Sequence, residues 1–263
     1  MRSLAAIAAI LFLLAGCGGS GKEKDETAGW SAEKIYTEAR SAMSEGQWDK
    51  AIKMFEKLES RYPYGRYAQQ AQLEVAYAYF KDKEPASAIA ACDRFIKLHP
   101  NHPNVDYAYY LKGLVNFNED LGITGYVVTQ DLSDRDPKAA REAFESFKDL
   151  ATKYPESKYA PDAIKRMNYL VNALSSHESY VAQYYYRRGA YVASVNRAQN
   201  LLKTYPNTPA TEEALAVLVR SYAAMGLPDL SKDSQRILEK TFPNSKYLNG
   251  APVGLAKAWW QFW

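Results

Sequence analysis

The sequence predicts an all-α solenoid of about five helical hairpins. An aromatic or His residue stands before Pro five times, at Tyr62-Pro63, His99-Pro100, Tyr154-Pro155, Tyr205-Pro206 and Phe242-Pro243, with spacings of 37, 55, 51 and 37 residues. Twelve residues before each Pro is a small residue, namely Ala51, Ala88, Ala143, Ser194 or Ser231. Five residues before each Pro is a large apolar residue, namely Leu58, Phe95, Leu150, Leu201 or Leu238. So many coincident positions indicate an internal repeat.

Each repeat position has a mechanical reason. Apolar residues recur at i, i+3, i+4 and i+7, as in Ala51, Met54, Phe55 and Leu58, which is the spacing of one helix face. Small residues let two helices approach closely, and large apolar ones fill the space beside them. Pro marks a helix end because inside a helix it costs about 3 kcal/mol. Sustained strand-like alternation is absent from the sequence, so each unit is predicted to be a helical hairpin.

Residues 1–16 read as a signal peptide, with Arg2 before an apolar stretch too short to span a bilayer. The stretch ends in Leu14-Ala15-Gly16-Cys17, which resembles the lipobox of bacterial lipoproteins. That resemblance implies that Cys17 becomes the acylated first residue, a firm membrane anchor. Gly18 follows where an Asp would favour the inner membrane, so the outer membrane is expected. Residues 17–29 are predicted to be a flexible tether.

The N-terminal repeats are assigned to residues 30–118. Residues 46–63, which include Trp48 and Phe55, resemble the second half of a tetratricopeptide repeat. The second repeat departs from that pattern, because Pro85 replaces the turn aromatic and Cys92 stands where the first repeat has Phe55. We therefore expect Cys92 to be a buried apolar residue.

An insertion is predicted at residues 119–136. Gly113 falls 37 residues after Ala76, which places a helix near residues 106–118, but the partner helix begins only at Pro137, with Asp136 as its N-cap. Loops of this length in compact domains are usually functional.

Residues 137–248 are assigned to the C-terminal repeats. Between Pro155 and Gly189 there is room for two helices, predicted at 159–174 and 179–188, with a solvated hinge at His177 and Glu178. The fifth repeat carries Lys232 and Gln235 at otherwise apolar positions, as expected of a capping unit.

Residues 249–263 form an aromatic tail that ends in Trp259-Trp260-Gln261-Phe262-Trp263. Two interpretations stay open. The tail rests on a membrane or partner surface, or it folds back over the last repeat.

Composition and motifs argue against several functions. The chain has 33 Lys and Arg against 30 Asp and Glu, so its net charge of +3 gives no footprint for nucleic acid. His99 and His102 both lie at a turn with Pro and lack neighbouring ligands, so no metal site is expected. Phosphate-binding and hydrolase motifs are absent. The sequence therefore predicts a protein that is not an enzyme and has no cofactor.

More specific stretches resemble the family of outer-membrane protein assembly factor BamD. They are residues 61–70 (RYPYGRYAQQ), 99–107 (HPNHPNVDY), 133–137 (SDRDP) and the pattern from Ala182 to Arg197. The resemblance implies a lipid-anchored periplasmic adaptor that folds β-barrels into the outer membrane. Its implied partners are BamA, other subunits of the complex and unfolded barrel proteins.

The resemblance also implies two binding regions. In the C-terminal half, Arg197 is expected to form an ion pair with BamA, with Tyr184, Tyr185 and Arg188 as neighbours. In the N-terminal half, a Tyr-lined concave surface would suit an alternately apolar signal strand with a terminal aromatic residue. The candidates there are Tyr62, Tyr64, Tyr67, Tyr77 and Tyr107.

Alternatives remain at this stage. A packing role is open for Tyr62, which precedes a recurrent Pro, and for Tyr77 and Tyr107, which lie on core helices. A second function is a scaffold lipoprotein for other cell-envelope processes. A third possible function is that of a cell-wall hydrolase. It would need a catalytic Glu in a separate domain, whereas the predicted repeats occupy the chain after Trp30.

Overall fold

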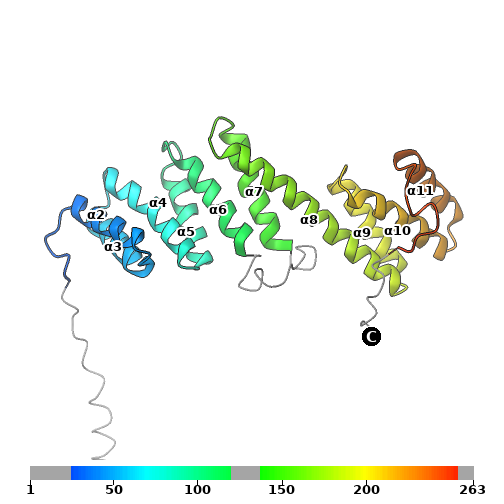
Figure 1. Ribbon diagram of the computed structural model, residues 1–263, viewed down its shortest axis with the longest axis horizontal. Coiled ribbons are helices and arrows are strands. Elements are labelled where there is room, and N and C mark those ends of the chain that lie inside the picture. The colour runs from blue at the N-terminus through cyan, green and yellow to red at the C-terminus, as the bar shows by residue number, and fades with distance from the viewer. Residues whose placement is uncertain (1–24, 120–136, 254–263) are drawn as a thin grey trace, which may run out of the picture.

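The computed structural model describes residues 25–119 and 137–253, and every regular element in these two ranges is a helix. The helices are α2 (Ala32–Ser44), α3 (Trp48–Arg61), α4 (Arg66–Lys81), α5 (Pro85–Leu98), α6 (Val105–Glu119), α7 (Pro137–Lys153), α8 (Ala160–Arg187), α9 (Tyr191–Thr204), α10 (Ala210–Ala224) and α11 (Pro228–Thr241). They follow one another along an elongated molecule (Figure 1). The predicted all-α fold is confirmed.

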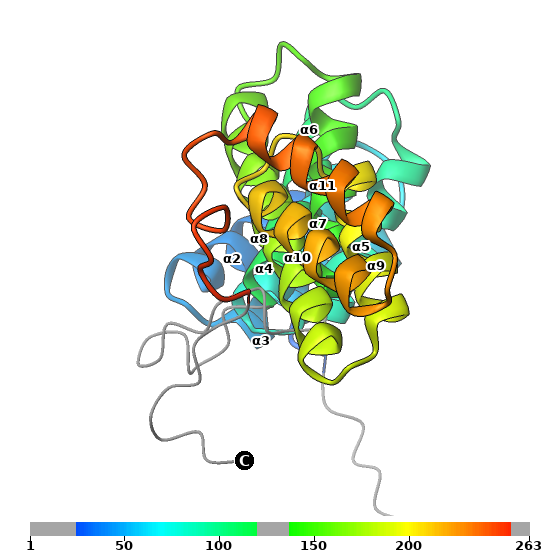
Figure 2. The same cartoon turned by 90° about the vertical axis from the view of Figure 1, so that its right-hand side faces the viewer.

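The helices pair as five hairpins: α2 with α3, α4 with α5, α6 with α7, the second half of α8 with α9, and α10 with α11. Consecutive helices pack together along the whole series, which is the arrangement of a tetratricopeptide-like solenoid. In the end-on view, α2, α4 and α8 lie to the left of α5 and α9 (Figure 2), and first helices of neighbouring hairpins contact one another, α2 with α4, α4 with α6 and α8 with α10. The first helices of the hairpins therefore share one face of the molecule.

The repeated positions build the core. The residues five before each Pro are at most 2% exposed. Ala51, Ala88, Ala143 and Ser194 are fully buried at the position twelve before it. Where Ser replaces Ala, its hydroxyl donates to the partner helix, from Ser194 to the carbonyl of Ala182 at 2.8 Å and from Ser231 to that of Val219 at 2.9 Å. Small residues thus allow close approach, and Ser adds a hydrogen bond.

The residue before each recurrent Pro ends its helix. The backbone N–H of Tyr62 donates to the carbonyl of Leu58 at 2.8 Å, and the equivalent bond recurs in the other four repeats, from His99, Tyr154, Tyr205 and Phe242. The next residue is Pro, which has no N–H to continue the ladder. The dipeptide therefore marks the last helical hydrogen bond of each hairpin.

One element differs from the prediction. Residues 160–187 form a single 28-residue helix, α8, where two helices with a hinge were expected. Neither Gly nor Pro occurs between Pro161 and Gly189, so nothing in the backbone interrupts the helix. Glu178 is 2% exposed, which contradicts its predicted position in a solvated hinge. Ser175, Glu178 and Ser179 are buried against neighbouring helices, whereas Ser176 is exposed.

The predicted tether also differs at its end. Residues 26–29 form a turn, and the carboxylate of Asp25 accepts hydrogen bonds from Thr27, which is 3% exposed. The same carboxylate pairs with Lys57 at 3.2 Å and with Arg61. The last residues of the tether are therefore fastened to α3, because their polar groups find partners there.

Other predicted boundaries are partly described. Glu119 belongs to α6, while residues 120–136, including the predicted N-cap Asp136, lie outside the described part. The same holds for the signal peptide, Cys17 and residues 254–263. Of the tail, Val253 is 7% exposed and packs into the core around α10, and Arg220 donates to the carbonyl of Ala251. This first part of the tail folds back over the last repeats.

Among the described helices, none has both the length and the apolar character that crossing a membrane requires.

Candidate binding surfaces

A cavity of about 520 Å³ lies against the first helices of the N-terminal repeats. Tyr36 and Arg40 come from α2, Leu73, Glu74 and Tyr77 from α4, and Tyr107 from α6, and Lys158 and Tyr159 border it just before α8. The side chains converge because residues three and four apart on each helix share a face, and stacked helices present the same face. The hollow is therefore built by three successive repeats.

Four Tyr rings form part of its wall. The ring centroids of Tyr107 and Tyr159 lie 5.4 Å apart, and Tyr77 packs edge-on against Trp48 at 6.2 Å. Burial raises the pKa of Tyr107, and burial together with the Glu74 carboxylate raises that of Tyr36. Both phenols therefore stay protonated at neutral pH and can donate hydrogen bonds to a ligand.

Charged groups lie at the same cavity. Arg40 forms an ion pair with Glu74, whose carboxylate also raises the pKa of the guanidinium. Lys158 adds a second cation beside the ring of Tyr159, 5.0 Å from its centroid. The combination of rings, phenol donors and two cations suits an apolar or aromatic side chain that lies close to a carboxylate or carbonyl oxygen.

The structure divides the five predicted Tyr residues. Tyr77 and Tyr107 line the cavity, and Tyr67 lies beside it because its ring is 5.5 Å from that of Tyr36. Tyr62 is turned elsewhere, since its hydroxyl donates to the carbonyl of Trp30 at 2.7 Å. Tyr64 is 92% exposed in the turn between α3 and α4. The cavity thus gathers two of the five residues and borders a third.

Sequence reasoning missed Tyr36, Arg40, Glu74 and Tyr159. A signal for two of them existed, because Tyr36 and Arg40 stand 37 residues before Leu73 and Tyr77. They occupy the same face of the first helix, one repeat earlier. Tyr159 carried no such signal, since it reaches the cavity through the turn before α8.

A second surface lies where α8 ends. The rings of Tyr184 and Tyr185 meet edge to face at 5.8 Å. The guanidinium of Arg188 lies 5.5 Å from the Tyr184 ring, and its Nε donates to the Tyr184 hydroxyl at 3.3 Å. Tyr184 is 42% exposed. These three predicted residues are therefore brought together as an exposed aromatic and cationic patch.

Arg197 lies on α9 and faces the buried carboxylate of Glu178 on α8. Its Nη1 is 3.2 Å from Oε2 of Glu178, and Nη2 of Arg141 on α7 is 3.6 Å from Oε1. The carboxylate is 3% exposed, whereas the side chains of Arg197 and Arg141 are 45% and 52% exposed. Two half-exposed cations from neighbouring repeats thus share one buried anion, and the cluster keeps one positive charge at the surface.

Comparisons with known proteins point to one family. The family described as "Outer membrane lipoprotein" matches residues 29–238. The outer membrane protein assembly factor BamD of Neisseria meningitidis serogroup A is 46% identical over the full length of both chains. The chain belongs to the BamD family.

More distant members of the BamD family match as well. The BamD of Xylella fastidiosa strain Temecula1 is 38% identical over 94% of this chain and 84% of its own. The BamD of Vibrio cholerae is 37% identical over 87% of this chain and 94% of its own. Among solved structures, the MamA protein matches with a TM-score of 0.38 and 15% identity, over 86% of this chain and 98% of that chain. Membership of the BamD family assigns the chain to outer-membrane protein assembly and to the scaffold type of protein.

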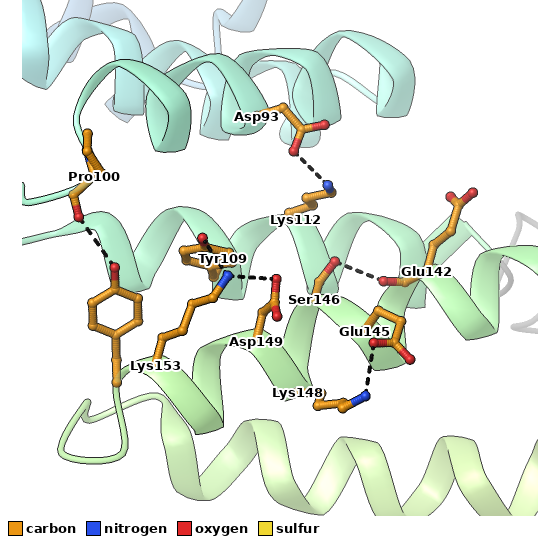
Figure 3. Close-up of polar contacts among 11 residues, drawn as sticks. Asp93, Pro100, Tyr109, Lys112, Glu142, Glu145, Ser146, Lys148, Asp149 and Lys153 are labelled. Atoms are coloured by element: carbon orange, nitrogen blue, oxygen red, sulfur yellow. Dashed lines mark hydrogen bonds and ion pairs between the residues drawn. The ribbon is translucent and has the colours of Figure 1, made fainter.

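This BamD-family chain has another hollow, of about 590 Å³, between α5 and α7. Lys112 contacts Asp93 at 2.6 Å, and Lys153 lies between Asp149 and the hydroxyl of Tyr109 at 3.1 and 3.2 Å (Figure 3). Glu145 similarly contacts Lys148 at 3.3 Å. Because its carboxylates have cationic neighbours at the surface, we interpret this hollow as a solvated ion-pair network.

The paired His residues take part in packing. His99 shares a hydrogen bond of 2.7 Å with Gln72, and the ring of His102 lies 5.1 Å from that of Phe95. Burial lowers the pKa of His102. Within residues 25–119 and 137–253, no group of three His, Cys, Asp or Glu side chains is placed to hold a metal ion.

Proposed function

We propose that the chain is a lipid-anchored periplasmic adaptor of the outer-membrane β-barrel assembly complex. Acylated Cys17 holds it on the periplasmic face of the outer membrane. Its C-terminal repeats dock on BamA, and its N-terminal repeats recognise unfolded barrel proteins before they fold and insert. The protein works by binding alone, as an adaptor without a catalytic centre.

The observation that carries this proposal is the Tyr-lined cavity. In a barrel signal strand every second side chain is apolar, and the strand ends in an aromatic residue. Tyr36, Tyr77 and Tyr107 offer rings for such a residue. Arg40 and Lys158 offer cations for a backbone carbonyl or terminal carboxylate beside it. A site that recognises only the terminal aromatic residue and the alternating apolar residues can bind clients of many different sequences.

Docking on BamA is assigned to the opposite half. Tyr184, Tyr185 and Arg188 form an exposed patch of the residue types that dominate binding energy at interfaces. Arg197 is half exposed and retains a free edge for a partner carboxylate beyond its contact with Glu178. The two binding regions are separated along the solenoid, so one chain can hold a client and BamA together.

A pull-down of the detergent-solubilised lipoprotein tests the docking surface. We expect wild type to recover BamA and Arg197→Glu to lose it. The matched control is Arg141→Glu, which places the same new negative charge beside the buried Glu178. Retention of BamA by this control would show that the loss comes from the Arg197 contact and not from repulsion inside the cluster.

Other outcomes count against the proposal. Loss of BamA from both variants would place the effect in the fold around Glu178. Recovery of BamA by both would move the docking surface away from Arg197. If wild type itself brings down no integral barrel protein, the adaptor function fails, and a scaffold for other envelope processes becomes the better explanation.

A further inference from the structure

The first residues that the structure describes are held against the end of α3. Asp25 is joined to Lys57 and Arg61 near the end of α3, and Thr27 is buried beneath it. Close by, the hydroxyl of Tyr62 holds the carbonyl of Trp30. We call Asp25, Thr27, Lys57 and Arg61 the anchor clip. The clip fixes where the chain that leads to Cys17 leaves the solenoid.

The reach from that point is short. Asp25 is the eighth residue after Cys17, and eight residue steps span at most about 28 Å when the chain is fully extended. Tyr64 lies two residues beyond Tyr62, so their Cα atoms are within about 7 Å of each other. If Cys17 carries the lipid, as the proposed function requires, the turn from α3 to α4 lies close to the membrane surface.

Charge is distributed unequally between the two edges of the solenoid. Every second helix of a hairpin has a cation in its last turn, namely Arg61, Lys97, Lys153, Lys203 and Lys240. Three further cations, Arg66, Lys158 and Lys246, follow in the adjoining turns. Segments 60–66, 97–105, 152–160, 203–210 and 240–247 hold these eight cations and one carboxylate, Glu156, a net charge of +7. We call these segments the basic edge. The first turns of α6, α8 and α10 begin at the same edge and add four carboxylates, Asp106, Asp162, Glu212 and Glu213, so the edge together with these turns carries +3.

Within residues 25–119 and 137–253, the opposite edge is nearly neutral. Segments 43–48, 80–85, 186–191 and 223–228 join first helices to second ones, and they hold four cations and three carboxylates, a net charge of +1. Cations are favoured at helix C-termini by the helix dipole. Yet α2, α6 and α10 have none in the last turn, so the dipole alone does not account for five cations in five second helices.

The basic edge also carries exposed apolar side chains. Tyr64 is 92% exposed, and Leu98, the last residue of α5, is 54% exposed. The turns after α3, α5 and α7 lie along the same upper edge in Figure 1. Aromatic and basic side chains together are the combination that rests on a phospholipid headgroup layer.

We propose that the basic edge is a membrane-facing surface, which the anchor clip and the lipid on Cys17 hold against an anionic phospholipid layer. The inference rests on the proposed lipid anchor and adds an orientation. The second-helix ends face the membrane, and the first-helix ends face the periplasm. Each Lys or Arg that lies at the anionic surface raises the membrane affinity on the order of fivefold.

The experiment uses the full lipidated protein in vesicles of phosphatidylethanolamine and phosphatidylglycerol. An environment-sensitive fluorophore is attached at Tyr64→Cys or, as the opposite-edge control in the same hairpin, at Glu45→Cys. The chain without an added cysteine serves as the labelling blank, since Cys92 is fully buried. We expect spin-labelled lipids to quench the probe at position 64, with a blue-shifted emission, and to leave position 45 unquenched.

Charge reversal then tests the edge itself. Lys97→Glu with Lys203→Glu should lower the quenching at position 64 at least fivefold in the anionic vesicles, whereas Lys83→Glu with Arg187→Glu on the opposite edge should not. Circular dichroism checks that both variants fold. Equal quenching at positions 64 and 45, or equal effects of the two charge reversals, overturns the proposal.

Flotation separates the two levels of inference. If the wild-type chain does not float with vesicles, the lipid anchor of the proposed function fails, and the proposed orientation fails with it. If it floats but position 64 is not quenched, anchoring stands and the membrane-facing edge is wrong.

Discussion

At position 113 the fold leaves room for a hydrogen atom and nothing larger. A Cβ built on Gly113 would lie 2.5 to 2.8 Å from three ring carbons of Phe147, whose side chain is fully buried. The equivalent positions of the first two repeats hold Ala39 and Ala76. The third repeat needs Gly because the large ring of Phe147 presses directly on α6.

Gly113→Ala should therefore destabilise the protein although Ala favours helix. Overpacking costs about 1–3 kcal/mol, against a helix gain of roughly 1 kcal/mol. Thermal unfolding should show a lower Tm for the variant. Adding Phe147→Leu should recover part of that loss, so a double-mutant cycle without favourable coupling would contradict the proposed clash.

Cys92 provides a pH-dependent test at the same scale. Burial raises the pKa of its thiol from 9.0 to about 12. In the unfolded chain the thiol ionises above pH 9, whereas in the folded chain it stays protonated, so unfolding releases a proton. The contribution of the buried thiol to the free energy of unfolding is complete below pH 9 and is lost as the pH rises toward 12.

Urea unfolding at pH 8, 9 and 10 should then show a steeper loss of stability for wild type than for Cys92→Ala. The difference should approach about 1 kcal/mol per pH unit above pH 9. The Tyr residues with raised pKa are present in both chains, so their contribution cancels. Parallel curves would mean that the thiol is not desolvated in the folded state.

At the scale of elements, sequence reasoning succeeded where the signal is local. The recurrent Pro and the Leu or Phe five residues before it predicted the hairpins, because helix termination and core filling depend on neighbouring residues in the chain. It failed at α8, where Ser175, Ser176, His177 and Glu178 look like a polar break. The burial of Ser175 and Glu178 against neighbouring helices is a tertiary effect that a single sequence does not display.

The continuity of α8 can be tested with a single Pro. Ser176 is exposed in the middle of the helix, so Ser176→Ala should change the stability by no more than about 0.5 kcal/mol. Ser176→Pro removes a helical hydrogen bond and should cost about 3 kcal/mol. Because α8 joins the two halves of the solenoid, thermal unfolding should also separate into two transitions. A single transition at the wild-type temperature would contradict a rigid connecting helix.

At the scale of the whole molecule, the candidate site was predicted only in part. The family resemblance pointed to Tyr77 and Tyr107, which do share a cavity, but also to Tyr62, whose hydroxyl holds the carbonyl of Trp30. Arg40 and Glu74 were missed because an ion pair between α2 and α4 depends on how repeats stack. The partner of Arg197 was likewise invisible, since Glu178 lies 19 residues away in the chain.

The solenoid architecture makes the two proposed activities separable. Each repeat contacts mainly its neighbours, so a change in the cavity should not reach the α8–α9 surface. Tyr77→Ala removes a ring from the cavity wall. It should lower the affinity for a synthetic peptide with alternating apolar residues and a terminal Phe by tenfold or more, as measured by fluorescence anisotropy. Recovery of BamA should be unchanged.

Tyr79→Ala is the matched control, because Tyr79 lies on the same helix, is half-buried and bonds Glu56 away from the cavity. The affinity of the Tyr79→Ala variant for the peptide should stay within about twofold of wild type. Losing a ring outside the cavity lowers the stability of the fold but removes no contact with the peptide. Arg197→Glu should show the converse pattern, with peptide binding kept and BamA lost. Equal losses of peptide affinity in Tyr77→Ala and Tyr79→Ala would mean that the helix, and not the cavity, determines client recognition.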